Sequence, residues 1–145
     1  MTAMDVREVL ADPAQGGAYF VDARESDSLS EAASALEFSV TRIDLTGCRD
    51  KETVLDRIAQ ALHFPEWFGA NFDALADSLG DLSWLPADGY LLLLEHADEW
   101  RQADDDNFAT LLDILNEAAV NWGDYGVPFW ALLPLPEEQL SKLAF

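Results

Sequence analysis

The stretch GYLLLLEHA, residues 89–97, is a continuous apolar run of strand length that ends in charged and polar residues. An unbroken run of this kind predicts a strand that is buried on both faces, as in the middle of a parallel sheet. A second apolar run, VPFWALLPL at 127–135, follows after one helix-length of chain. Two buried strands that are separated by a helix indicate an α/β domain with a parallel sheet.

The segments on either side of these runs extend the same pattern. AYFVDA at 18–23 and SVTRIDL at 39–45 predict two further strands, and amphipathic stretches predict helices between them. The order indicates one compact α/β domain, with a small parallel sheet of about four strands, flanked by helices and joined by right-handed crossovers. Strands are expected near 18–23, 39–45, 90–95 and 128–133. Helices are expected at 5–11, 28–36, 50–62 and 71–80, from Asp106 or Asn107 to 123, and after Pro136, with Gly80 closing the fourth helix.

Charge is distributed very unevenly along the 145 residues, whose net charge is −20. Between Ile58 and Ser141 there are sixteen Asp or Glu residues and one base, Arg101. Such a surface repels nucleic acids and anionic membranes, so we expect neither as a partner. It attracts a basic protein, although an acidic surface also serves solubility alone.

Targeting signals and disulfides are not indicated by the sequence. The longest apolar run, Tyr90 to Leu94, is far too short to span a membrane, and the N-terminal residues do not resemble a signal peptide. Cys48 is the single cysteine, so no internal disulfide can form. A reducing cytoplasm is the expected location.

Sequence motifs for catalysis are weak. DARES, which follows the first strand, carries no glycine for a phosphate-binding loop, and Cys48 has no base that sequence can assign to it. EHADEW at 95–100 offers acids and a histidine where a strand ends, which suits a metal or acid–base site only in residue type. We expect no enzymatic activity, no cofactor and no metal. A small metal-dependent enzyme stays an alternative; its site would use Glu95, His96, Asp98 or Glu99.

The stretch FPEWFGANFDALADSLG, residues 64–80, sets aromatic residues and a glycine before an acidic helix. Asn71 is placed to cap that helix, and Phe72, Leu75, Ala76 and Leu79 would face the core. Asp73 and Asp77 then share one exposed flank. Like charges four residues apart on a helix repel by roughly 0.2–0.5 kcal/mol per pair, and no base lies nearby to compensate them.

Residues 65–77, PEWFGANFDALAD, resemble the barstar family of intracellular inhibitors of barnase-type ribonucleases. The similarity extends from about Ser39 to Leu135. The resemblance implies a barstar-like domain at 39–145, with residues 1–38 as an N-terminal extension that packs on the same domain and adds an edge strand and a helix. It also implies that an acidic helix and the adjacent aromatic turn block the active-site cleft of a basic secreted ribonuclease or toxin nuclease. The protein would protect the cell that makes it, as an immunity protein, and would be a monomer when free.

The family's inhibitory surface, carried over by position, gives the candidate partner-binding residues. In the family two aspartates at the positions of Asp73 and Asp77 enter the basic cleft, where carboxylates can take the place of phosphates. A tyrosine that packs on the nuclease is replaced here by Trp67, and Glu117 matches a glutamate that adds a charge contact. The complete set is Trp67, Phe68, Gly69, Asn71, Asp73, Asp77, Trp84 and Glu117.

Departures from the family pattern leave the partner open. Ala76 stands where a family member has a tryptophan, Gly80 where that member has a threonine, and Asn121 where it has a second glutamate. The loop at 80–89 is longer, and Trp84 could supply an aromatic contact there. An acidic interaction module of the same fold, which binds a basic protein other than a nuclease, is therefore the main alternative function.

Overall fold

The computed structural model describes residues 6–65 and 71–139. Within these residues one four-stranded sheet is present, with all strands parallel and in the order β1-β4-β3-β2. The expected small parallel sheet with flanking helices is confirmed. The strands are β1 (Gly17–Asp22), β2 (Ser39–Asp44), β3 (Tyr90–Glu95) and β4 (Phe129–Leu135).

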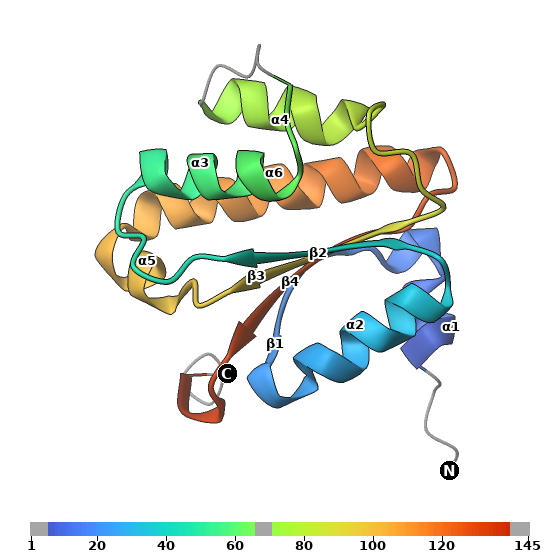
Figure 1. The fold of residues 1–145 in the computed structure, drawn as a ribbon, viewed down its shortest axis with the longest axis horizontal. Coiled ribbons are helices and arrows are strands. Elements are labelled where there is room, and N and C mark those ends of the chain that lie inside the picture. The colour runs from blue at the N-terminus through green and yellow to red at the C-terminus, as the bar shows by residue number, and fades with distance from the viewer. Residues whose placement is uncertain (1–5, 66–70, 140–145) are drawn as a thin grey trace.

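Helices cover both faces of this sheet. Figure 1 shows α3, α4 and α6 on one side and α1 and α2 on the other. No helix among the described residues is long and apolar enough to cross a membrane. The labelled α-helices are α1 (Val6–Leu10), α2 (Ser26–Ala35), α3 (Lys51–Ala61), α4 (Phe72–Asp81), α5 (Asp98–Ala103) and α6 (Asp105–Asp124), and two short 3₁₀ helices are η1 (Pro13–Gln15) and η2 (Ala23–Glu25). Residues 137–139 are also helical, just after Pro136, where a helix is expected.

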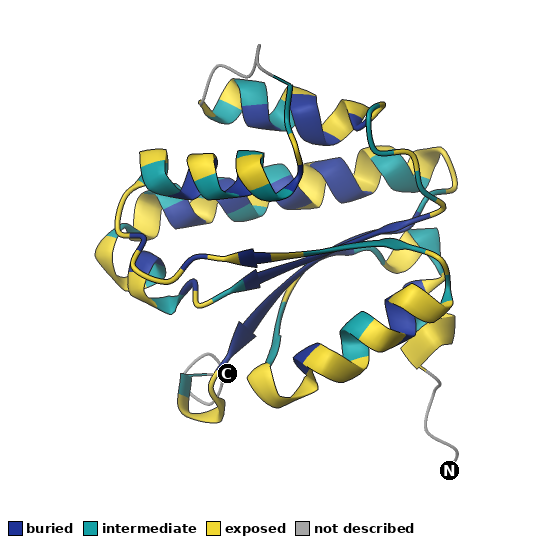
Figure 2. Ribbon diagram, in the orientation of Figure 1, coloured by how far each residue is buried: buried dark blue, intermediate teal, exposed yellow. Residues whose placement is uncertain are grey.

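The two central strands are buried on both faces, as their continuous apolar sequences predict (Figure 2). In β3, Leu91 and Leu93 pack with residues of α1 and α2, whereas Leu92 and Leu94 pack with residues of α3 and α6. Side chains of a strand alternate between its faces, so one apolar run supplies both cores. Each central strand therefore needs a cover of helices on either side.

The N-terminal segment supplies one of these covers. β1 pairs with β4 along its length. α1 and α2 bury the face of the two central strands that is opposite to α3 and α6. The ring N–H of Trp130, in β4, donates to the carbonyl of Leu10 at 2.9 Å. The edge strand and helix expected from residues 1–38 are thus part of the same sheet and core.

The end of α4 differs from the expectation that Gly80 would close it. The helix includes Gly80 and ends at Asp81, and Leu82 then adopts a left-handed conformation with φ of 45°. Leu82 is buried in the main core, and this burial offsets the cost of a left-handed leucine. The ring N–H of Trp122, from α6, donates to the carbonyl of Leu79 at 2.8 Å and satisfies a group at the helix end.

The beginning of α6 and the presence of α5 also differ from the expectation. α6 begins at Asp105, before the Asp106 and Asn107 that were predicted to cap it. The preceding residues form α5, which the sequence did not indicate, and the fully buried ring of Trp100 anchors it. The Trp100 ring N–H lies 3.3 Å from the Asp104 carboxylate, at the junction of the two helices.

Candidate protein-binding site

Helix α4 is held in a defined position by its cap and its buried face. The Asn71 side-chain oxygen accepts a hydrogen bond from the Ala74 N–H at 2.7 Å, as the sequence predicts for an N-cap. Leu75 and Leu79 are fully buried in the core that includes residues of α6. Their burial fixes the rotation of α4, and so fixes which of its residues face outward.

The outward flank of α4 carries Asp73, Asp77 and Asp81, spaced four residues apart. All three are exposed, and none of them forms an ion pair within the described part of the chain. Asp73 lies in the first turn, where the helix dipole favours a negative charge, but Asp81 lies in the last turn, where the dipole disfavours it. The flank is therefore electrostatically unfavourable in the free protein.

Helix α6 brings a further acid to this flank. Asp77 of α4 and Glu117 of α6, forty residues apart in sequence, line the same pocket, which has a volume of about 140 Å³. The small side chains of Ala76 and Ala118 leave this space open between the helices. Ala76, which the sequence placed on the core side, is half-buried and lies at the pocket wall. We call this the α4–α6 pocket; its lining is Ala76, Asp77, Ile114, Glu117, Ala118 and Asn121.

The aromatic members of the candidate set do not all join this surface. Trp84 is half-buried, donates its ring N–H to the carbonyl of Leu62 at 3.0 Å, and meets the Phe64 ring edge-on with centroids 5.8 Å apart. These contacts give Trp84 a packing role in the loop after α4. Trp67, Phe68 and Gly69 lie outside the described residues.

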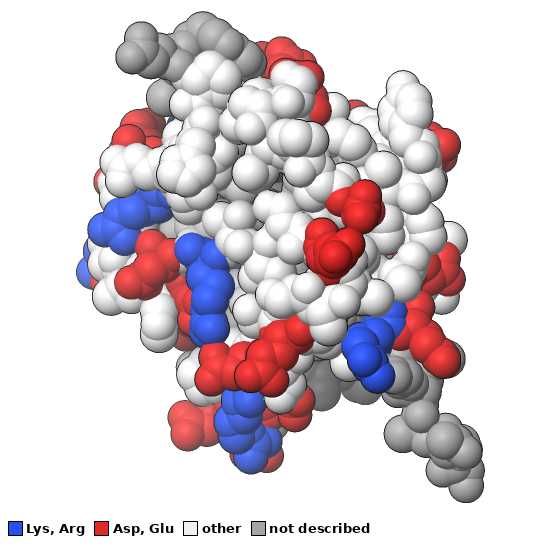
Figure 3. Space-filling view, turned by 45° about the vertical axis from the view of Figure 1, so that its right-hand side comes forward, with Lys and Arg blue, Asp and Glu red and all other residues white. Residues whose placement is uncertain are grey.

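The acids at the end of β3 have a different environment, because arginines neutralise them. Glu95 accepts from Arg42 at 2.6 Å, and Arg42 also binds Asp27 of α2 at 2.8 Å. In the described residues no group of three potential metal ligands occurs. Figure 3 shows basic side chains next to acidic ones on the face that it draws. The remaining pairs near this strand end are Arg101–Asp98 and Arg49–Glu99.

Cys48 is fully buried in the main core. Burial raises the pKa of the Cys48 thiol, which favours the protonated form. A nucleophilic cysteine needs the thiolate, so this environment suits a packing residue.

Sequence reasoning missed several residues of the α4–α6 pocket as site residues. Ile114 and Ala118 line it together with Glu117 and with Asn121, which the family resemblance had already placed where a relative carries a second glutamate. The signal that could have found them is their spacing, since positions three, four and seven apart share one face of a helix. The register of that face against α4 needed the tertiary structure.

Comparison with known proteins gives a family and a likeness of fold to solved structures. No curated protein sequence matches the chain. A solved structure of the Aeropyrum pernix ORC2 protein, in ADPNP–ADP complexes, matches with a TM-score of 0.54 and 17% sequence identity, over 88% of this chain and 36% of that one. This chain thus spans little more than a third of that protein, and the likeness concerns the fold alone. The family model described as Barstar (barnase inhibitor) matches residues 38–134, about two thirds of the sequence, and the chain therefore belongs to the barstar family.

Proposed function

We propose that this protein inhibits a basic secreted ribonuclease or toxin nuclease by inserting the acidic flank of α4 into its active-site cleft. The observation that carries the proposal is that Asp77 of α4 and Glu117 of α6 converge on one pocket. The aspartates of α4 form no ion pair among the described residues, and the Lys51 ammonium lies over the ring of Phe72, at the start of this helix, 5.4 Å from the ring centroid. Membership of the barnase-inhibitor family supports it. The protein would act in the cytoplasm, as an immunity protein of the producing cell.

The physical basis is complementarity to a phosphate-binding cleft. A ribonuclease binds its substrate backbone through cationic side chains, which preorganised carboxylates can engage in place of phosphates. The buried face of α4 and the Asn71 cap hold Asp73 and Asp77 in place before binding. Little backbone entropy is then lost on association.

The unfavourable acidic flank has a function under this proposal. In the free protein Asp73, Asp77 and Asp81 repel one another, and a basic partner would relieve that repulsion on binding. The net charge of −20 would also accelerate association with a basic protein. The association rate is therefore expected to fall as salt is added, because exposed charges are screened.

The test uses barnase as the probe and RNA hydrolysis as the readout. The parent protein is expected to inhibit hydrolysis, and Asp77→Ala to weaken binding by about 2–5 kcal/mol, because truncation leaves buried cations of the partner unpaired. This range is general to truncation of buried interfacial charge pairs, and the barnase–barstar complex, whose close charge pairs couple by about 1.5–7 kcal/mol, is a known example. Glu31→Ala, on α2 beyond the sheet, is the matched control and should inhibit as the parent does.

The outcomes separate the proposed function from its alternative. Full inhibition by Asp77→Ala together with a loss in Glu31→Ala would mean that the interface lies on another face. Binding of barnase without loss of RNA hydrolysis would favour an acidic interaction module of the same fold. Asp27 is unsuitable as a control, since it forms an ion pair with Arg42.

A further inference from the structure

The C-terminal half of α6 exposes apolar residues among acids. Glu117, Val120, Asn121 and Asp124 follow one another at helical spacing and are all exposed. Val120 is 62% exposed, and Tyr125, just beyond the helix, is 83% exposed. Two of the four large hydrophobic residues that are exposed in the described chain are therefore near this helix end, although the five-residue step between their positions turns the helix by about 140°. Large apolar side chains that are exposed near one another in the chain are candidates for an interaction surface.

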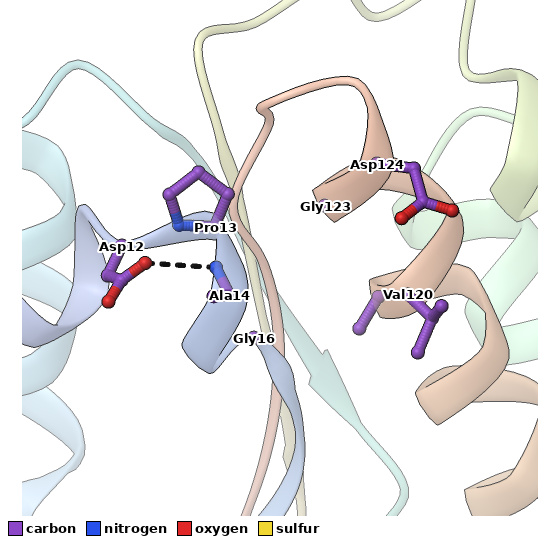
Figure 4. Close-up of a pocket in the computed structure, with 8 residues that line it drawn as sticks. Asp12, Pro13, Ala14, Gly16, Val120, Gly123 and Asp124 are labelled. Atoms are coloured by element: carbon purple, nitrogen blue, oxygen red, sulfur yellow. Dashed lines mark hydrogen bonds between the residues drawn. The ribbon is translucent and has the colours of Figure 1, made fainter.

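A second pocket, with a volume of about 410 Å³, lies on the other side of this helix half. Figure 4 shows Asp12 on its η1 side, and Val120 and Asp124 on its α6 side. We call this the α6–η1 pocket; its lining is Asp12, Pro13, Ala14, Gly16, Ala119, Val120, Gly123 and Asp124.

The η1 wall of this pocket is held firmly. A Cβ built on Gly123 would lie 2.9 Å from the carbonyl oxygen of Pro13, so the two backbones are in close contact. The Asp12 carboxylate accepts a hydrogen bond from the Ala14 N–H at 3.0 Å. The pocket is therefore formed before any partner arrives.

The two pockets flank one helical strip. Glu117, Ala118 and Asn121 face the α4–α6 pocket, while Ala119, Val120 and Asp124 face the α6–η1 pocket. The surface is thus continuous from α4 across α6 to η1. Residues 12–16 lie outside the segment that matches the family, 38–134, so this part of the surface is contributed by the extension.

We propose that the C-terminal half of α6 and η1 form a second contact region for the same basic nuclease that the acidic flank of α4 engages. This inference rests on the proposed function. The region takes an apolar side chain of the partner against Val120 and Tyr125, and cationic side chains against Asp12 and Asp124. The N-terminal extension is then a determinant of partner choice.

Charge and interface size both favour a basic protein as the partner that binds this region. A second copy of the chain would bring a further charge of −20 to an acidic surface, whereas a basic protein is attracted to it. Standard protein interfaces bury about 800 Å² on each partner and combine an apolar centre with a polar rim. The α4–α6 pocket is lined by only six residues, whereas an interface of standard size takes about 20–30 residues from each partner. Val120 and Tyr125 supply the apolar component beside it.

The test measures the dissociation constant of the full-length protein with catalytically inactive barnase. Asp124→Lys is compared with Glu31→Lys, because both variants raise the net charge by the same amount. Asp124→Lys should raise the dissociation constant at least about tenfold more than Glu31→Lys does. Asp124 lies at the C-terminal end of α6, where a lysine favours the helix dipole, so unfolding does not explain the loss.

A second pair of variants tests the apolar component. Tyr125→Ala should weaken binding about fivefold or more, as an aromatic contact at an interface does. Val6→Ala, an exposed apolar residue on α1, is its control and should bind like the parent protein.

Each outcome decides the inference separately from the proposed function. If Asp77→Ala weakens binding while Asp124→Lys equals Glu31→Lys and Tyr125→Ala equals the parent, the second contact region is wrong and the proposed function stands. If the parent binds neither barnase nor any other basic ribonuclease in a panel tested with it, both are overturned. If light scattering gives a dimer of the parent that Tyr125→Ala dissociates, the patch binds a second copy and the inference is wrong.

Discussion

Asp77 is a residue at which stability and binding oppose each other. It is exposed in the middle of α4, four residues from both Asp73 and Asp81. We predict that Asp77→Ala raises the free energy of unfolding by about 1 kcal/mol, because alanine has a higher helix propensity and two like-charge pairs are removed. Urea unfolding measures this change. A loss of stability above about 1 kcal/mol would instead indicate a structural role for Asp77 and weaken the case for a binding role.

Asp50 gives a prediction for acid unfolding. Its carboxylate accepts from the N–H and hydroxyl of Thr53 at 2.8 and 2.7 Å, and these hydrogen bonds lower its pKa in the folded state. A lowered folded-state pKa contributes stability above the unfolded-state value of about 4, and this stability is lost as pH falls through the folded-state pKa. Asp50→Asn keeps the cap but not the titration, so its stability should fall less between about pH 5 and pH 2 than that of the parent. Equal losses in urea unfolding at the two pH values would contradict the assignment.

The roles of single residues were predictable where they depend on local sequence. The capping of α3 by Asp50 and of α4 by Asn71 follows from residue type and position, and the structure confirms both. Trp84 could not be assigned in this way. Its ring N–H bonds to Leu62, twenty-two residues away, and sequence does not reveal such a contact.

At the scale of elements, α4 contains a glycine at a position where neither backbone conformation nor space requires one. Gly80 lies inside the helix, and a Cβ built there has no atom within 4 Å. We predict that Gly80→Ala raises the free energy of unfolding by about 0.5–1 kcal/mol, since alanine loses less backbone entropy in a helix. Thermal or urea unfolding tests this. A lower stability would show that α4 ends at Gly80 in solution, as the sequence first suggested.

The types of the elements were more predictable than their ends. Unbroken apolar runs indicated β3 and β4 because both faces of these strands are buried, and this signal needs no knowledge of their neighbours. The end of α4 depends on the burial of Leu82 against distant parts of the core, which overrides the preference for glycine. α5 is held by the buried Trp100 and has only six residues, too few for a periodic pattern.

At the scale of the whole molecule, the candidate site could be predicted only in part. The exposed flank of Asp73 and Asp77 followed from helical periodicity, whereas the pairing of Glu117 with that flank came from family resemblance. Neither source gives the α4–α6 pocket, which depends on how Ala76 and Ala118 face each other across two packed helices. The α6–η1 pocket depends in addition on the close approach of Pro13 to Gly123.

The N-terminal extension shares its sheet and core with the segment that matches the family, which leads to a last prediction. We propose that residues 1–38 and 39–145 unfold as one cooperative unit, because β1 and β4 share a sheet and α1 and α2 cover its outer face. A Cβ on Gly16 would lie 2.5 Å from the backbone oxygen of Phe129, while its φ of −56° suits alanine. Gly16→Ala should therefore force β1 away from β4 and lower the free energy of unfolding by about 1–3 kcal/mol, purely through steric overlap.

Amide hydrogen exchange distinguishes cooperative loss from local loss. If the molecule is one unit, Gly16→Ala should reduce the protection of the most stable amides of β3 and α6 as well as those of β1, because global unfolding limits all of them. Gly80→Ala is the matched control, since the same methyl group is added where space is open. Loss of protection confined to α1, β1 and α2 would contradict the prediction. The extension would then unfold separately, and η1 could move away from α6 and open the α6–η1 pocket while the family segment stays folded.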